Sequence, residues 1–166
     1  MSGLTITPAP LPVRAVIGDA EVVTFRLGRQ WFGVPVLDVQ EVLCAQRVAR
    51  VPLAPPDVQG FLNLRGQIVT AVNLHARLAV EPAGAETPMN VVVRDGDELF
   101  ALIVDEVGDV VAVPAEVVEP VPATLDDVWA RACTGVVQWE QGLLALLDAS
   151  RLLDDIYSAN LPGTVA

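Results

Sequence analysis

The alternation of apolar and polar positions along this chain is typical of short β-strands joined by frequent turns. Runs rich in branched and aromatic residues, such as Val22–Leu27 and Asn90–Arg94, end at turn-forming segments. The strongest of these is Asp95-Gly96, a dipeptide that favours a tight hairpin. Prolines at positions 52, 55, 56, 114, 120 and 122 restrict the connecting segments to edges and loops. The pattern predicts an all-β fold of small barrels, with short helices at Leu37–Leu43 and Leu152–Tyr157.

The segment from Val58 to Leu74 predicts a β-hairpin that is broken at Arg65-Gly66-Gln67. Apolar side chains fall on both faces of its two strands, whereas a hairpin at a solvated rim normally alternates apolar and polar residues. We therefore expect the hairpin to be covered on both sides. A guanidinium at its turn then requires an acidic partner, because an unpaired charge is costly to remove from water.

Two pairs of segments resemble each other in the same order along the chain. Residues 32–42 match residues 100–110 at an offset of 68, and residues 60–78 match residues 135–153 at an offset of 75. Two copies are too few for a solenoid. The repetition predicts two small barrels packed on each other, with the apolar hairpin near their junction.

Composition excludes several classes of partner. The net charge is −11, and all ten cationic residues are arginine, which disfavours nucleic acid and anionic membranes. No charge-free apolar stretch is long enough to span a bilayer. Residues 1–20 lack the features of an export signal and are predicted to form a flexible leader, with a tail at 155–166. These features predict a cytoplasmic protein, in which Cys44 and Cys133 are buried and reduced.

Few residues are available for catalysis. The single histidine, His75, is expected to have a structural role, and neither thiol has metal-ligand spacing. The absence of lysine removes phosphate-binding P-loops and Schiff-base chemistry. Acidic residues between positions 95 and 119 suggest a solvated face. The alternative is a carboxylate-based enzyme that uses Asp105, Glu106 and Asp109. We favour a binding protein without enzymatic activity, cofactor or metal.

The hairpin also carries a family resemblance. Gly60 to Gly66, read as G-F-L-N-L-R-G, resembles the signature of the CheW family of chemotaxis coupling proteins. Similar segments occur in the family's order: Phe25-Arg26-Leu27-Gly28, Val39-Gln40-Glu41-Val42, Val51-Pro52-Leu53-Ala54-Pro55, Ile103-Val104-Asp105-Glu106-Val107 and 135–148. The resemblance covers about Glu21 to Leu153.

The resemblance implies two SH3-like, five-stranded barrels around a shared core, in a domain spanning residues 21–154. It implies a scaffold that links the cytoplasmic tips of chemoreceptors to the regulatory domain of the histidine kinase CheA. A related alternative is a coupling protein for twitching motility or another output. The implied binding positions are Val39, Glu41, Gly60, Asn63, Leu64 and Arg65, with Val48, Val51 and Leu53 as a possible kinase-facing apolar edge.

Further interpretations concern individual positions. We expect Glu41 to pair with Arg65 across a groove and to orient both side chains toward a partner. Ala101 stands where the family usually has glycine, and Asn73-Leu74-His75 replaces the more usual Asp-Leu-Arg. These departures leave the interface of the second lobe and the pathway open.

Overall fold

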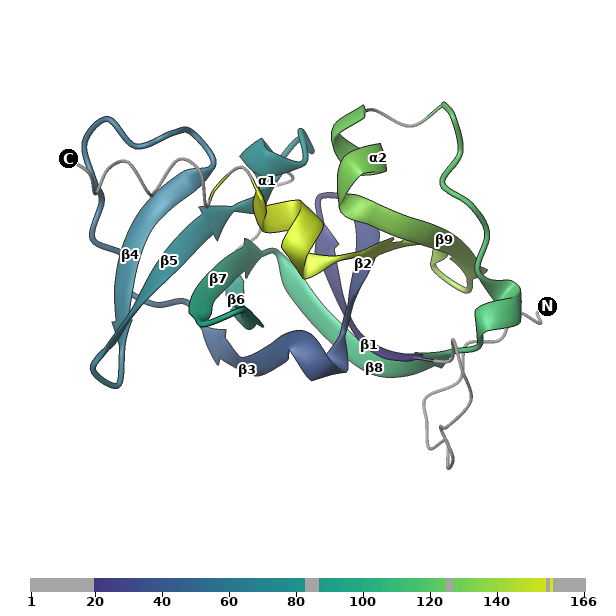
Figure 1. Cartoon of the computed structure of the whole chain (residues 1–166), viewed down its shortest axis with the longest axis horizontal. Helices are drawn as coiled ribbons and strands as arrows, with labels where there is room; N and C mark the ends of the chain where they lie inside the picture. The colour runs from purple at the N-terminus through teal and green to yellow at the C-terminus, as the bar shows by residue number, and fades with distance from the viewer. Residues whose placement is uncertain (1–19, 83–86, 125–126, 155, 157–166) are drawn as a thin grey trace.

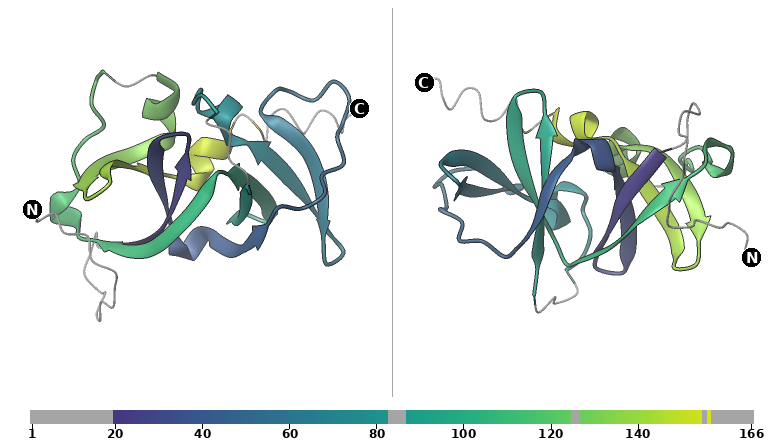
Figure 2. Two further views of the ribbon diagram at one scale, coloured as in Figure 1. Left: turned by 180° about the vertical axis from the view of Figure 1, so that it is seen from behind. Right: turned by 90° about the horizontal axis from the view of Figure 1, so that it is seen from below.

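Two β-sheet lobes lie side by side in the computed structural model, which describes residues 20–82, 87–124, 127–154 and 156 (Figure 1). Figure 2 shows the same lobes from behind and from below. The strands are β1 (Ala20–Leu27), β2 (Gln30–Pro35), β3 (Val39–Cys44), β4 (Val58–Leu64), β5 (Gln67–Asn73), β6 (Met89–Asp95), β7 (Glu98–Val104), β8 (Glu106–Val113), β9 (Cys133–Trp139) and β10 (Gly142–Leu147). The helices are η1 (Val36–Asp38), α1 (Leu74–Arg77), η2 (Ala115–Val117) and α2 (Asp127–Ala132), with a further helical segment at 149–154.

Each lobe contains one five-stranded sheet. We call the sheet with order β8-β1-β2-β10-β9 lobe A and the sheet with order β3-β6-β7-β5-β4 lobe B. The two orders are equivalent once the second half of the chain is superposed on the first, and each contains one parallel pair, β2–β10 or β5–β7. The predicted all-β fold with two five-stranded lobes is confirmed.

Strands are exchanged between the two halves of the chain. The first hairpin, β1–β2, lies in lobe A, but the chain then crosses at η1 to supply β3, β4 and β5 to lobe B. The second half does the reverse: β6–β7 lie in lobe B, and the chain crosses at Asp105 to supply β8, β9 and β10 to lobe A. Each lobe is therefore built from both halves.

One hydrophobic core joins the lobes. Phe25 and Phe32 stack with ring centroids 5.8 Å apart, and Phe32 also contacts Trp129 at 5.2 Å. This cluster continues through Val72 and Phe100 of lobe B and reaches the helical segment after β10. Because the largest core cluster draws on both sheets, the lobes share their main source of hydrophobic stabilisation.

The helix predicted at Leu37–Leu43 is wrong for most of its length. Only Val36–Asp38 forms a short 3-10 helix, and Val39–Cys44 is strand β3. The residues of β3 alternate between half-buried and exposed, which is the period of a strand. Pairing with β6 decides the outcome, since a 3-10 turn rarely continues beyond a few residues.

The hairpin β4–β5 is covered on both sides only at its root. Val58 and Val72 belong to the shared core, whereas Ile68 near the turn is 62% exposed. The turn lies at the far end of lobe B, away from lobe A (Figure 1). The expectation that the hairpin is covered on both sides is therefore wrong at its turn, because β4 is an edge strand. Its expected place near the junction holds for the root, where Val58 and Val72 enter the shared core.

Some smaller expectations also need correction. Cys44 is exposed, not buried, whereas Cys133 is buried, and burial raises the pKa of its thiol to about 11. The terminal helix begins at residue 149, earlier than predicted, and Tyr157 lies outside the described residues. The same is true of residues 1–19 and of most of the predicted tail. Within the described residues, no helix is long and apolar enough to cross a membrane.

Candidate protein-interaction site

The turn between β4 and β5 consists of Arg65 and Gly66, both with positive φ angles of 53° and 86°. Two positive φ angles are what a type I′ hairpin turn requires, and glycine or asparagine usually occupies such positions. The Asn63 side chain stabilises the turn, because its Oδ1 accepts a hydrogen bond from the Gly66 N–H at 2.8 Å. Arginine rarely adopts this left-handed backbone conformation, and such unusual conformations are common at functional sites.

The Arg65 side chain forms an ion pair with Glu41 of β3, from its Nη2 to the Glu41 Oε2. The predicted contact is thereby confirmed. Strands β3 and β4 are the two edges of the lobe B sheet, so the pair links edges that the curvature of the sheet brings together. The Arg65 side chain is 68% exposed and that of Glu41 only 23%. Such a surface pair adds about 0–1 kcal/mol to stability. Because most of the guanidinium is exposed, a partner can reach it.

Gly60 allows the β3–β4 loop to approach strand β4 closely in the same lobe. Its φ is 150°, and a Cβ added to it would lie 2.2 Å from the carbonyl oxygen of Ala49. Ala49 pairs with Phe61 there through hydrogen bonds of 2.7 and 2.9 Å. Glycine is therefore required for the β3–β4 loop to pack along β4.

The predicted binding positions divide into exposed and packed residues. Asn63, Arg65, Val51 and Leu53 are exposed, Leu53 fully so, and the exposed Val42 and Ile68 were not among the predicted positions. Val39, Glu41 and Val48 are half-buried, and Gly60 and Leu64 are buried. Val39 packs on the shared core and Val48 on the lobe B core. The predicted set is thus brought together on lobe B, although not all of it faces solvent.

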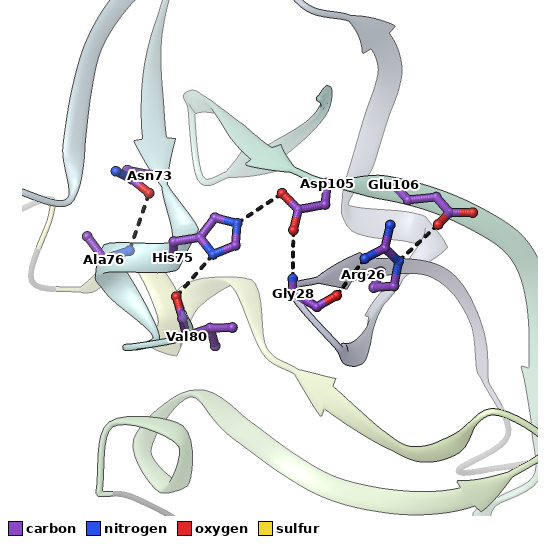
Figure 3. Close-up of polar contacts among 8 residues, drawn as sticks. All are labelled: Arg26, Gly28, Asn73, His75, Ala76, Val80, Asp105 and Glu106. Atoms are coloured by element: carbon purple, nitrogen blue, oxygen red, sulfur yellow. Dashed lines mark hydrogen bonds and ion pairs between the residues drawn. The ribbon is translucent and has the colours of Figure 1, made fainter. Parts of the chain in front are cut away.

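A second cluster of polar residues lies where the two lobes meet (Figure 3). The His75 Nε2 lies 2.9 Å from Oδ1 of Asp105, and the other carboxylate oxygen accepts from the Gly28 N–H at 2.6 Å. Next to it, Arg26 donates to Glu106 at 2.9 Å. The structural role of His75 stays a prediction, and these contacts are compatible with it. The Asp105 carboxylate is largely buried and contacts His75, whereas the Glu106 side chain is 54% exposed and pairs with Arg26.

Comparison with known proteins assigns the chain to a family. Residues 21–157 match the CheW-like domain family. The chain belongs to the CheW-like family. Chemotaxis protein CheW of Treponema pallidum is 30% identical over 155 residues, which are 90% of this chain and 91% of that protein. Chemotaxis protein CheW of Klebsiella aerogenes is 30% identical over 134 residues, 80% of this chain and 81% of that protein.

A solved structure supports the fold assignment. The scaffolding protein TtCheW from Thermoanaerobacter tengcongensis superposes with a TM-score of 0.70, at 24% identity, over 77% of this chain and 88% of that chain. The two sheets of this CheW-like protein are accordingly SH3-like barrels around a common core, as the resemblance implied.

Sequence reasoning missed the role of Asp105 in this CheW-like chain. The sequence placed Asp105 in an acidic stretch and in a family segment, but did not indicate that the chain crosses between the lobes at this residue. One feature of the sequence did point to this cluster: Asn73-Leu74-His75 replaces the Asp-Leu-Arg that is more usual in the family, and His75 contacts Asp105. The Asn73 side chain caps α1 by accepting from the Ala76 N–H at 3.3 Å, and α1 presents His75.

The electrostatics of Asp105 predict a dependence of stability on pH. Burial raises the pKa of Asp105, but hydrogen bonds from His75 and Gly28 and the charges of His75 and Arg26 outweigh it, so that this pKa lies below its ordinary value. A carboxyl with a lowered pKa in the folded state contributes stability above its unfolded pKa of about 4. That contribution is lost as pH falls through the folded pKa.

We therefore expect the wild type and Asp105→Asn to differ in free energy of unfolding near neutral pH and to converge in acid. Urea denaturation followed by circular dichroism at a series of pH values measures both proteins. A difference that stays constant from neutral pH to below about pH 3 would show that the ionised carboxylate is not what stabilises this junction.

Proposed function

We propose that this CheW-like protein is a non-enzymatic adaptor that holds chemoreceptors and the histidine kinase CheA together in a signalling array. It acts in the cytoplasm, binding the cytoplasmic receptor tip and the regulatory domain of the kinase. The binding surface on lobe B consists of the β4–β5 turn with the start of β5, strand β3 and the β3–β4 loop. We refer to it as the hairpin surface.

One observation carries this proposal: the hairpin surface displays a mostly exposed guanidinium together with exposed apolar side chains from the same lobe. Arg65 is held at a fixed place by its turn and by Glu41, while Val42 and Ile68 are exposed on the same two strands, β3 and β5. An apolar surface with a charge at its rim is a usual way to seat an amphipathic helix. A preorganised side chain also loses less conformational entropy on binding.

The buried members of the predicted set contribute indirectly in this proposal. Gly60 and Leu64 shape the hairpin from inside lobe B, whereas Asn63 fixes the turn that presents Arg65. Val51 and Leu53, exposed on the β3–β4 loop, form the proposed kinase-facing edge together with the half-buried Val48.

The proposal predicts that Arg65→Ala abolishes recruitment while the fold is retained. A partner that desolvates the guanidinium would lose about 2–5 kcal/mol of binding free energy when it is truncated. Folding loses little, since the pair is at the surface. The measurement is co-sedimentation of purified protein with receptor-bearing membranes and kinase, alongside circular dichroism and thermal melting.

The matched control is Arg29→Ala, which removes an exposed arginine from the β1–β2 turn of lobe A. It should sediment like the wild type. The double exchange Glu41→Arg with Arg65→Glu keeps opposite charges at the two positions but reverses their places. If the double exchange binds normally, the pair is only structural and the hairpin surface is not the contact. Failure of the wild type itself to sediment would contradict the adaptor function.

A further inference from the structure

A cleft opens where three short helical segments meet (Figure 1). Its walls are α1, which follows β5 of lobe B, α2, which precedes β9 of lobe A, and the terminal helix at 149–154. The cavity volume is about 710 Å³, within the range of about 300–1,000 Å³ that is usual for small-molecule sites. Among the described residues that line it, none comes from β3 or from the β4–β5 turn, so the cleft is separate from Arg65 and its contacts.

Hydrogen bonds hold the walls of the cleft together. The Trp129 Nε1 of α2 donates to the Leu78 carbonyl, just after α1, at 2.7 Å. The Arg77 Nε of α1 donates to the Leu152 carbonyl of the terminal helix at 2.8 Å. The Asp148 N–H, at the start of the terminal helix, donates to the carbonyl of the last residue of α2 at 2.9 Å. Because each wall is tied to the others, the cleft is formed before any ligand arrives, and binding costs little conformational entropy.

Each wall contributes one arginine to the cleft: Arg77 from α1, Arg131 from α2 and Arg151 from the terminal helix. The whole chain has only ten cationic residues and a net charge of −11, so three arginines in one cavity are a local concentration of positive charge. Two aspartates, Asp57 and Asp154, also line the cavity. The charged side chains of its described residues thus leave an excess of one positive charge in a strongly acidic protein. We call this cavity the arginine cleft.

The three arginines differ in how far the fold already uses them. The Arg77 side chain is only 15% exposed and pairs with Asp57 at 3.0 Å. Arg131 and Arg151 are exposed, and neither forms an ion pair with any residue that the structure describes. Arg151 donates from Nη1 to the Cys133 carbonyl at 3.3 Å. A guanidinium has five N–H groups, so most of those on Arg131 and Arg151 are available to a ligand.

A phosphate group matches two guanidiniums on separate helices better than a carboxylate does. A carboxylate carries one negative charge, and its two oxygens lie in one plane, so a single arginine fork satisfies it. A phosphate monoester carries a charge of about −1.5 to −2 at pH 7 and has three acceptor oxygens that point in different directions. Leu78 and Val128 add apolar surface to the cleft. A ligand with a phosphate group and an apolar body therefore fits both kinds of wall.

We propose that the arginine cleft binds a small phosphate monoester with an apolar body, to whose phosphate Arg131 and Arg151 donate while Arg77 holds the walls in place. This site goes beyond the proposed adaptor function, and its test needs no partner protein. The ligand contacts α1, α2 and the terminal helix together. Because it binds only where these segments are folded against each other, it stabilises the folded protein by mass action.

Isothermal titration calorimetry of the purified protein with phenyl phosphate tests the proposal. Phenyl phosphate should bind about tenfold more tightly than benzoate, which has the same ring but a single charge, and about tenfold more tightly than inorganic phosphate, which lacks the ring. All three anions are compared at one ionic strength, since salt screens exposed charges. Arg131→Gln and Arg151→Gln should each lower the affinity for phenyl phosphate about tenfold. The control Arg29→Gln, at an exposed arginine of the β1–β2 turn, should leave it unchanged.

Nuclear magnetic resonance locates the bound ligand. The largest amide shifts on adding phenyl phosphate should fall at residues 76–78, 130–132 and 150–152, which line the cleft. Phenyl phosphate should also raise the melting temperature of the wild type, and this rise should be lost in the double variant Arg131→Gln with Arg151→Gln. If loss of the Arg151 hydrogen bond destabilises that variant, Arg131→Gln alone decides the result. No binding by the wild type, equal affinity for all three anions, shifts outside these segments, or unchanged affinity in Arg131→Gln would overturn the site.

Discussion

Replacing Phe32 with alanine is expected to lower the free energy of unfolding by about 3–5 kcal/mol, the usual loss for a buried phenylalanine. Phe32 lies on β2, is fully buried, and contacts both Phe25 and Trp129. Its ring belongs to the core that both sheets share, so the cavity weakens the contact between lobes as well as lobe A. The effect should be large for a domain whose total stability is about 5–15 kcal/mol.

Urea denaturation, followed by tryptophan fluorescence and by far-UV circular dichroism, measures this loss. Because the core is shared, both signals should shift together in one transition. Leu144→Ala is the matched comparison, since Leu144 is equally buried but belongs to a cluster within lobe A. If Phe32→Ala produces two separate transitions, the lobes fold independently and the shared core does not couple them.

Replacing Gly60 with alanine should also lower the free energy of unfolding strongly, by about 2–6 kcal/mol. Two causes contribute: a φ of 150°, which L-residues rarely adopt, and a Cβ that would approach the Ala49 oxygen to 2.2 Å. Backbone strain contributes about 1–3 kcal/mol and overpacking a similar amount. The β3–β4 loop must then move away from β4, which also disturbs the hairpin surface.

Gly66→Ala separates these two causes. Gly66 also has a positive φ, of 86°, but nothing lies within 4 Å of where its Cβ would be. It should therefore lose only the conformational part, about 1 kcal/mol. Chemical denaturation of both variants gives the comparison. Equal losses would mean that the packing of Ala49 against Gly60 adds nothing, and that the loop is free to move.

The strand content and the duplication could be predicted because they follow from local pattern. Alternation, turn dipeptides and proline placement are read within a few residues, and a repeat needs only self-similarity. The segment 37–43 was misread because Val39 and Val42 fit a helix and a strand equally well over so short a length. Only its pairing with β6, about fifty residues later, determines the outcome.

Part of the candidate site could also be predicted from local sequence pattern. A guanidinium at an apolar turn requires an acid, and Glu41 proved to be that acid. Which parts of the hairpin meet solvent depends on the strand order of the sheet, which no local pattern contains. The contact of His75 with Asp105 joins residues 30 positions apart across two lobes, so it follows from the crossing of the chain and not from either residue's neighbours.

The exchange of strands between halves has a consequence for synthesis on the ribosome. The hairpin β1–β2 emerges first, yet every other strand of its sheet, β8, β9 and β10, is made in the second half of the chain. Lobe B can close once β7 has been made, but lobe A cannot close until β10 near the end of the chain, so the earliest apolar strands wait longest for their neighbours. Nascent chains of this topology should depend on chaperones that shield exposed strands, and should be prone to aggregate when translation stalls after β5.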